Sequence, residues 1–162
     1  MAMFVIVGGK MMSQSDFERL LFRDTEMNHN EVLGYKGDDK IRVVMKAPLQ
    51  QAEIKLIGKD LESMQAIVGG DIDCIPLGTT NLDLYHHSTG KMEKLMPNLK
   101  YEENGKVLDI MVGTVFVSKV LDGEEVSLAP HECFQAITEL EKLSIKSANE
   151  ALHFRVQVDR MY

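Results

Sequence analysis

A helix that ends at a pair of glycines constrains the fold of this chain more than any other sequence feature. Apolar residues recur at helical spacing through residues 59–68, and Asp60 places a carboxylate near the start of that stretch, where it complements the helix dipole. Gly69 fits the left-handed backbone position that ends a helix, and Gly70 permits a sharp reversal of the chain. We therefore predict a helix over residues 59–68 that leads directly into a strand.

Strands are predicted wherever apolar residues alternate with polar ones or run continuously between turn residues. The predicted strands cover residues 3–7, 41–47, 52–57, 71–77, 81–87, 107–110, 113–121 and 152–159. Residues 113–121 are apolar on both faces, which predicts a central strand that is covered on both sides. Residues 152–159 alternate cleanly, which predicts a strand with one face toward water.

Two further helices are indicated outside these strands. Pro130 suits the first turn of a helix, and apolar residues recur at helical spacing across residues 130–146. Ser15 and Glu18 have the form of a capping box, which predicts a short N-terminal helix over residues 15–23.

Together these elements predict an α+β fold, in which a curved antiparallel sheet carries two main helices over residues 59–68 and 130–146. The length of 162 residues is close to that of a single domain and allows a self-standing core. We expect one domain over residues 1–162, with residues 1–40 forming an extension packed on a core of residues 41–162.

Composition excludes several classes of protein and of site. The net charge of −7, with lysine and arginine scattered, disfavours direct binding of nucleic acid. Two cysteines, Cys74 and Cys133, make neither a disulfide framework nor a zinc site, and we expect both to be buried reduced thiols. Asp71 and Asp73 share a strand face, but two carboxylates alone make no cation site. The apolar residues 1–7 are too short to span a membrane, so we expect a cytoplasmic protein without metal or cofactor.

Four phrases of the sequence resemble one known family. They are Leu61–Ile72 around the glycine pair, Met96–Asn98, Asp109–Val117, and Ser127-Leu128 before the second long helix. Over about residues 41–145 the chain is similar to domain-of-unknown-function family 3846. The resemblance implies a protein of a bacteriophage, a plasmid or another mobile element, and it implies no particular activity.

Polar residues with chemical potential gather on the predicted strand 81–87. Asp83, Tyr85 and His87 alternate and therefore share a face, whereas His86 lies on the opposite one. Such a set could perform acid–base chemistry or hold a polar ligand, and an ordinary solvated strand face is the competing interpretation. No complete set of acid, base and nucleophile is recognisable, so we predict no catalytic residues.

Our leading hypothesis is a non-enzymatic counter-defence binder of a mobile element that sequesters a small nucleotide-type immune signal. The expected ligand-binding residues are Tyr85, His87, Lys91, Asn98 and Lys100. Tyr85 would stack on a base, and the cationic side chains would meet phosphate.

Three other hypotheses stay open. The protein could bind and block a host defence protein, including by acting as an acidic DNA mimic. It could be a small hydrolase of nucleotides that uses His87 and Asp83. It could also be a regulatory or structural phage protein. Because the predicted strand 152–159 could form an exposed sheet edge, we expect a homo-oligomer.

Overall fold

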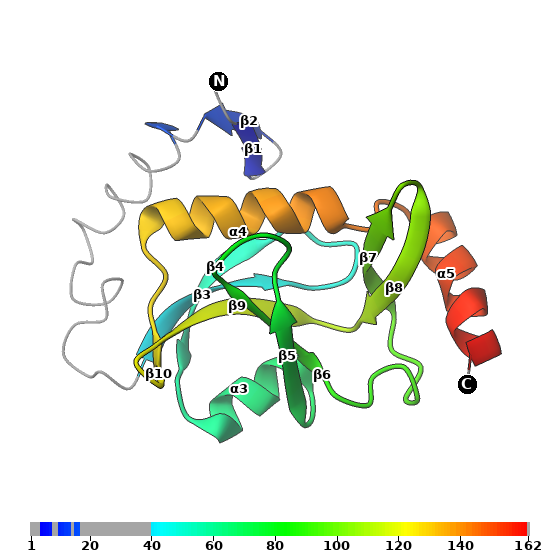
Figure 1. Ribbon diagram of the computed structural model, residues 1–162, viewed down its shortest axis with the longest axis horizontal. Helices are drawn as coiled ribbons and strands as arrows, with labels where there is room; N and C mark the ends of the chain where they lie inside the picture. Colours follow the sequence, from blue (N-terminus) through cyan, green and yellow to red (C-terminus); the bar gives the residue numbers. More distant parts are fainter. Residues whose placement is uncertain (1–3, 8–9, 14, 17–39, 162) are drawn as a thin grey trace.

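The computed structural model describes residues 4–7, 10–13, 15–16 and 40–161 and confirms the α+β class (Figure 1). The described strands are β1 (Phe4–Val7), β2 (Lys10–Ser13), β3 (Lys40–Lys46), β4 (Glu53–Gly58), β5 (Ile72–Pro76), β6 (Asp83–His87), β7 (Pro97–Glu103), β8 (Lys106–Val112), β9 (Val115–Leu121) and β10 (Glu124–Val126). The described helices are α3 (Leu61–Val68), α4 (Pro130–Leu143) and α5 (Ala148–Met161). The predicted helix over residues 15–23 lies outside the described residues except at Ser15 and Asp16, which are helical.

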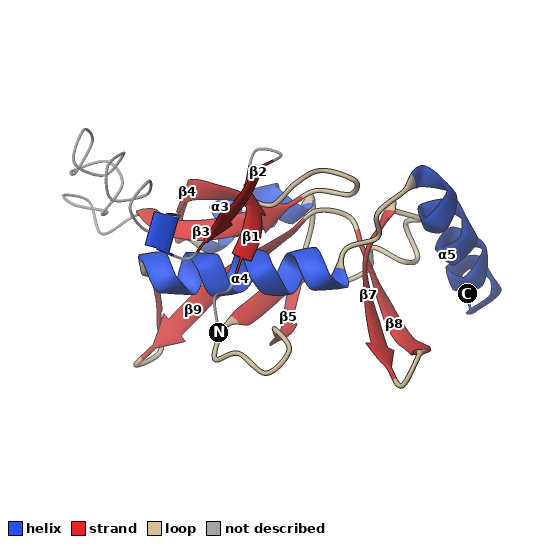
Figure 2. Cartoon of the chain, turned by 90° about the horizontal axis from the view of Figure 1, so that it is seen from above, coloured by secondary structure: helices blue, strands red, loops and turns tan. Residues whose placement is uncertain are grey.

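The main sheet is antiparallel, with strand order β4-β3-β9-β6-β5. The short strand β10 pairs with the C-terminal end of β9. The prediction that residues 113–121 form a central strand is confirmed, because β9 lies between β3 and β6 and its first four residues are buried. At one edge of the sheet, β5 pairs with β6 on one side only. The N-terminal pair β1–β2 lies over α4 (Figure 2).

The two faces of the sheet are covered by different helices, so the core has three layers (Figure 1). The face toward α4 is packed by a cluster that includes Val44, Leu84 and Val117. The opposite face, toward α3, is packed by a cluster that includes Val43, Tyr85 and Phe116. Each strand contributes neighbouring residues to opposite clusters because side chains alternate along a strand.

Both ends of α3 involve the residues that the sequence analysis placed there, Asp60 at the start and Gly69 at the end. The Asp60 carboxylate accepts a hydrogen bond of 2.9 Å from the Ser63 amide and caps the start of the helix. Gly69 has a φ of 86°, and its amide donates to the Gln65 carbonyl at 2.8 Å. The glycine therefore supplies the left-handed ending that its position in the sequence predicted.

The predicted strand over residues 152–159 is wrong, because this segment lies within helix α5. Ala151, Phe154 and Val158 are buried at helical spacing against the β7–β8 hairpin, whereas Leu152 is 61% exposed. The alternation of apolar residues along this segment therefore does not match the pattern of residues that are buried. It follows that the exposed strand edge from which a homo-oligomer was expected does not exist at this position.

The β7–β8 hairpin was recognised only in part from the sequence. Residues 107–110 were predicted as a strand and lie within β8, but β7 was missed, as were β2 and β10. Asn104 and Gly105, with φ angles of 53° and 79°, form the two-residue turn between Glu103 and Lys106. The hairpin packs at one end of the molecule between the main sheet and α5 (Figure 2).

Candidate functional site

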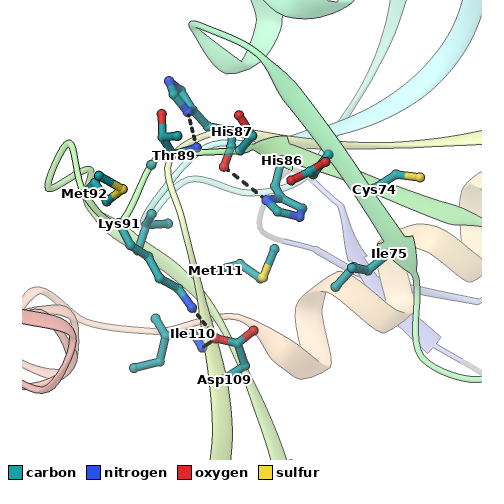
Figure 3. Close-up of a pocket in the computed structure, with 14 residues that line it drawn as sticks. Cys74, Ile75, His86, His87, Thr89, Lys91, Met92, Asp109, Ile110 and Met111 are labelled. Atoms are coloured by element: carbon teal, nitrogen blue, oxygen red, sulfur yellow. Dashed lines mark hydrogen bonds and ion pairs between the residues drawn. The ribbon is translucent and has the colours of Figure 1, made fainter. Parts of the chain in front are cut away.

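A cleft of about 380 Å³ lies where the free edge of the main sheet faces strand β8 (Figure 3). Strand β5 contributes Asp73, Cys74 and Ile75, and the end of β6 with the following loop contributes residues 86–92. Residues 109–112 of β8 form the opposite wall. The cleft thus combines three segments that are distant in sequence, and its shape depends on the packing of the hairpin beside the sheet.

The polar groups of the cleft have both signs of charge. Lys91 Nζ lies 2.5 Å from Asp109 Oδ1, so the ion pair bridges the loop and β8 (Figure 3). Asp73 is exposed and pairs in register with His86 across β5 and β6, which places both side chains on the same face of the sheet.

His86 presents one unoccupied ring nitrogen in the described part of the chain. Its Nδ1 lies 3.1 Å from the carbonyl oxygen of His87. A carbonyl oxygen only accepts, so Nδ1 carries the proton and neutral His86 keeps Nε2 as an acceptor. The ring can therefore accept a hydrogen bond from a ligand when neutral and donate one when protonated.

His87 adjoins the cleft but serves the fold. Its Nδ1 accepts from the Thr89 amide at 3.1 Å, and its Nε2 lies 2.8 Å from Glu93 Oε2. A Cβ atom at Gly70 would lie 2.4 Å from Nε2, so this glycine makes room for the imidazole. The second glycine of the pair therefore has a packing role in addition to the chain reversal.

Tyr85 lies on the α3 face of the sheet, away from the cleft. Its ring stacks on Phe116 at a centroid distance of 4.9 Å, and its hydroxyl donates a hydrogen bond to Glu125. Burial raises the pKa of Tyr85 well above its usual range, and the bond to Glu125 adds to the rise. The interpretation of this face as solvated is wrong, since Tyr85 and His87 are both buried.

Asn98 is completely buried and joins three backbone segments. Its amide nitrogen donates to the carbonyls of Lys46 at 2.9 Å and Gly113 at 2.8 Å. Its Oδ1 accepts from Lys46 Nζ at 3.0 Å. Lys100 lies on β7, where it forms an ion pair of 2.8 Å with Glu150 of α5.

Of the five residues proposed from the sequence, the structure brings His87 and Lys91 together at the cleft. Tyr85, Asn98 and Lys100 lie elsewhere and are engaged by other parts of the fold. Asp73, His86 and Asp109, which the sequence did not single out for this cleft, line it together with His87 and Lys91. Their selection requires the strand register and the position of the hairpin, which no local pattern encodes.

Cys74 is exposed, which corrects the expectation that it would be buried, whereas Cys133 is buried as expected. The pKa of the Cys74 thiol is raised, first by partial desolvation and then by three nearby carboxylates. The thiol is therefore protonated at neutral pH and is a weak nucleophile. Within the described residues, no group of three or more His, Cys, Asp or Glu is placed to hold a metal ion.

Comparison with known proteins identifies the family. Residues 41–142 match DUF3846, a domain of unknown function. The chain belongs to this family. No curated protein and no solved structure matches the chain. The DUF3846 segment contains the main sheet except for Lys40, the first residue of β3, and every residue of the cleft, whereas α5 lies beyond it. No helix in the described part of this DUF3846 protein is long and apolar enough to cross a membrane.

Proposed function

We propose that this DUF3846 protein is a non-enzymatic, cytoplasmic binder of a phage or mobile element that sequesters a small nucleotide-type signal of host defence. The observation that carries the proposal is the cleft, where Asp73, His86, Lys91 and Asp109 converge from separate segments. Its volume of about 380 Å³ falls in the range of small-molecule sites.

The chemistry of the cleft supports one class of nucleotide over others. Asp73 and Asp109 can accept hydrogen bonds from ribose hydroxyls or a base amino group, and Lys91 can meet one phosphate. Met92, which is 68% exposed, and Met111 supply apolar surface for a base. Because two carboxylates repel further negative charge, the cleft suits a cyclic or ADP-ribose-type nucleotide better than a triphosphate.

Sequestration without turnover is supported by the state of the reactive groups. The Cys74 thiol has a raised pKa, and His87 is held by Glu93 and Thr89. Neither group is therefore an activated nucleophile or a base poised beside one.

Calorimetry of the full chain against cyclic AMP, cyclic ADP-ribose, ADP-ribose and ATP tests the proposal. We expect one-to-one binding of at least one of the first three and weaker binding of ATP. Lys91→Met should weaken that binding about tenfold by removing the phosphate partner, while Lys142→Met on the exposed side of α4 should leave it unchanged. Absence of binding across the panel would exclude this function.

Chromatography of the same mixtures separates sequestration from hydrolysis. We expect every nucleotide to be recovered intact after prolonged incubation with the protein. Products that accumulate with time and disappear in a His87→Ala variant would instead support the hydrolase hypothesis.

The open edge of β5 favours a second candidate, the blocking of a host protein. The register with β6 directs the amides and carbonyls of Asp73 and Ile75 inward and those of Ile72 and Cys74 outward. An extended segment of a partner could add to this edge as a further strand. This alternative predicts a stable host-protein complex that Cys74→Pro, which removes an outward amide, would weaken.

A further inference from the structure

Away from the cleft, the buried side chain of Arg42 lies on the face of β3 that the helix α4 covers. Arg42 of β3 is only 3% exposed, and its Nε and Nη1 have no hydrogen-bond partner among the described residues. Arg42 precedes Val44 by two residues and therefore shares its face, which packs against α4. A buried guanidinium with unpartnered nitrogens is costly, because desolvation is not offset by new hydrogen bonds.

The backbone of Arg42 is tied to the segment that leads into α4. Its amide donates to Ser127 Oγ at 2.9 Å, and its carbonyl accepts from the Leu128 amide at 2.9 Å. Burial raises the pKa of the Cys133 thiol, in the first turn of α4, to about 12, and the positive charge of Arg42 opposes that rise. Arg42 therefore lies beside the segment that enters the helix, on the face of β3 that α4 covers.

The N-cap residue of α4 provides no side-chain acceptor for the first-turn amides. This residue is Ala129, whose side chain cannot accept a hydrogen bond from the first-turn amides. The carboxylate of Glu132 turns back to the Ala129 amide at 2.9 Å and pairs with Lys119 at 2.9 Å. Within the described part of the chain, the 14-residue helix thus keeps first-turn amides without a side-chain acceptor, at the positive end of its dipole.

Among the described residues, the charged groups that interact around this point are Arg42, Lys119 and, when protonated, His131, together with the carboxylate of Glu132. The balance of these described groups is positive although the whole chain carries a net charge of −7. Both the unpartnered guanidinium and the helix start favour a negatively charged acceptor.

We propose that Arg42 and the first turn of α4 form a binding site for a single oxyanion, either a carboxylate or a phosphate. The small exposure of Arg42 limits the site to one such group rather than the body of a large ligand. The site is independent of the cleft, which is built from β5, β6 and β8.

Thermal unfolding of the full chain at constant ionic strength tests the proposal. We expect inorganic phosphate or acetate to raise the melting temperature by about 3 °C when present in excess over its dissociation constant, with sodium chloride as the reference. The two anions distinguish a phosphate site from a carboxylate site. A wild-type protein that responds to neither anion overturns the proposal.

Matched variants locate the response. Arg42→Met should abolish it, whereas Lys40→Met, which removes an exposed charge from the same strand, should preserve it. Arg42→Lys keeps a charge but loses the guanidinium, so it should weaken the response and serves if the Met variant does not fold. Lys91→Met in the cleft should respond like wild type. An equal response in wild type and in an Arg42 variant would overturn the assignment.

Discussion

Arg42 and Lys46 lie four residues apart on the same face of β3, and both are buried beneath α4. Lys46 Nζ donates to the Asn98 side chain at 3.0 Å and to the Ala47 carbonyl at 2.9 Å. Arg42, at the other end of the helix, keeps two nitrogens without partners in the described chain. The same strand therefore buries one cation whose partners the fold provides and one whose partner we infer to come from outside.

The helix itself contributes to this difference. Lys46 lies near the C-terminal end of α4, where it lines a small cavity with Glu141 and Ser144. A cation is favoured at the negative end of the helix dipole and disfavoured at the positive end, where Arg42 lies. Burial alone therefore does not show that a cationic side chain stabilises the fold. That depends on whether the fold supplies hydrogen-bond partners for it.

The same distinction separates the buried group around Asn98 from the cleft. Asn98 and Gly113 lie in two of the phrases that resemble the family, within its matched segment, and they meet near Lys46 in the interior. Asp73 and His86 of the cleft keep polar atoms that can meet a ligand. Asn98 thus holds the fold together, and we propose that ligand binding uses cleft groups whose hydrogen-bonding capacity the fold leaves open.

The largest loss of stability should come from replacing Asn98, the centre of the buried hydrogen-bonded group that also includes Lys46 and Gly113. Asn98→Leu breaks three hydrogen bonds: it removes the side-chain donor of the buried Lys46 and Gly113 carbonyls and the side-chain acceptor of Lys46 Nζ. We expect the free energy of unfolding to fall by about 4 kcal/mol, as measured by urea denaturation. A loss below about 1 kcal/mol would show that this group is not a structural centre.

A pH series isolates the charge of Lys46. Burial lowers its pKa from 10.5 to about 8 in the folded protein, against an attraction from Glu141. Between these values the unfolded chain binds the extra proton, so the Lys46 contribution to stability rises with pH. We expect wild type to gain up to about 3 kcal/mol relative to Lys46→Met between pH 8 and pH 10.5. The difference between the two proteins cancels the opposing titration of Cys133, Tyr85 and Tyr101, and a flat difference would contradict the burial of a charged Lys46.

The same substitution at the two cations sharpens the comparison directly. Lys46→Met leaves the oxygen of Asn98 without its donor and removes one of two donors from the Ala47 carbonyl, which keeps the Gln50 amide. It should cost about 2 kcal/mol at neutral pH. Arg42→Met removes an unpartnered buried charge and should raise stability by about 1 kcal/mol without added anion. Equal losses in urea denaturation would show that Arg42 has partners within the folded chain.

The sequence predicted the elements whose signals are local. Asp60 and Gly69 define the ends of α3, and the apolar run of β9 identified the central strand. The error at α5 arose because its apolar residues alternate, although Ser147 and Glu150 have the spacing of a helix start and the Glu150 amide donates to Ser147 Oγ. Burial of the α5 residues depends on the β7–β8 hairpin, which alternation along the chain does not encode.

The candidate site was less accessible to sequence reasoning for a physical reason. Polar side chains on one strand pointed to Tyr85 and His87, but α3 covers that face. The cleft residues Asp73, His86 and Asp109 meet only because β5 pairs with β6 in one register and β8 packs beside them. Such long-range placement follows from the assembled fold and not from spacing along the chain.

Amide chemical-shift mapping by NMR tests the central claim most directly, namely that the ligand meets the cleft and not the satisfied interior. Cyclic AMP, cyclic ADP-ribose and ADP-ribose are titrated in turn into the full chain. We predict that at least one of them shifts the amides of residues 73–75, 86–92 and 109–112 and leaves those of Lys46, Asn98 and Gly113 in place. Shifts centred on Asn98, or no shifts with any of the three, would contradict the account.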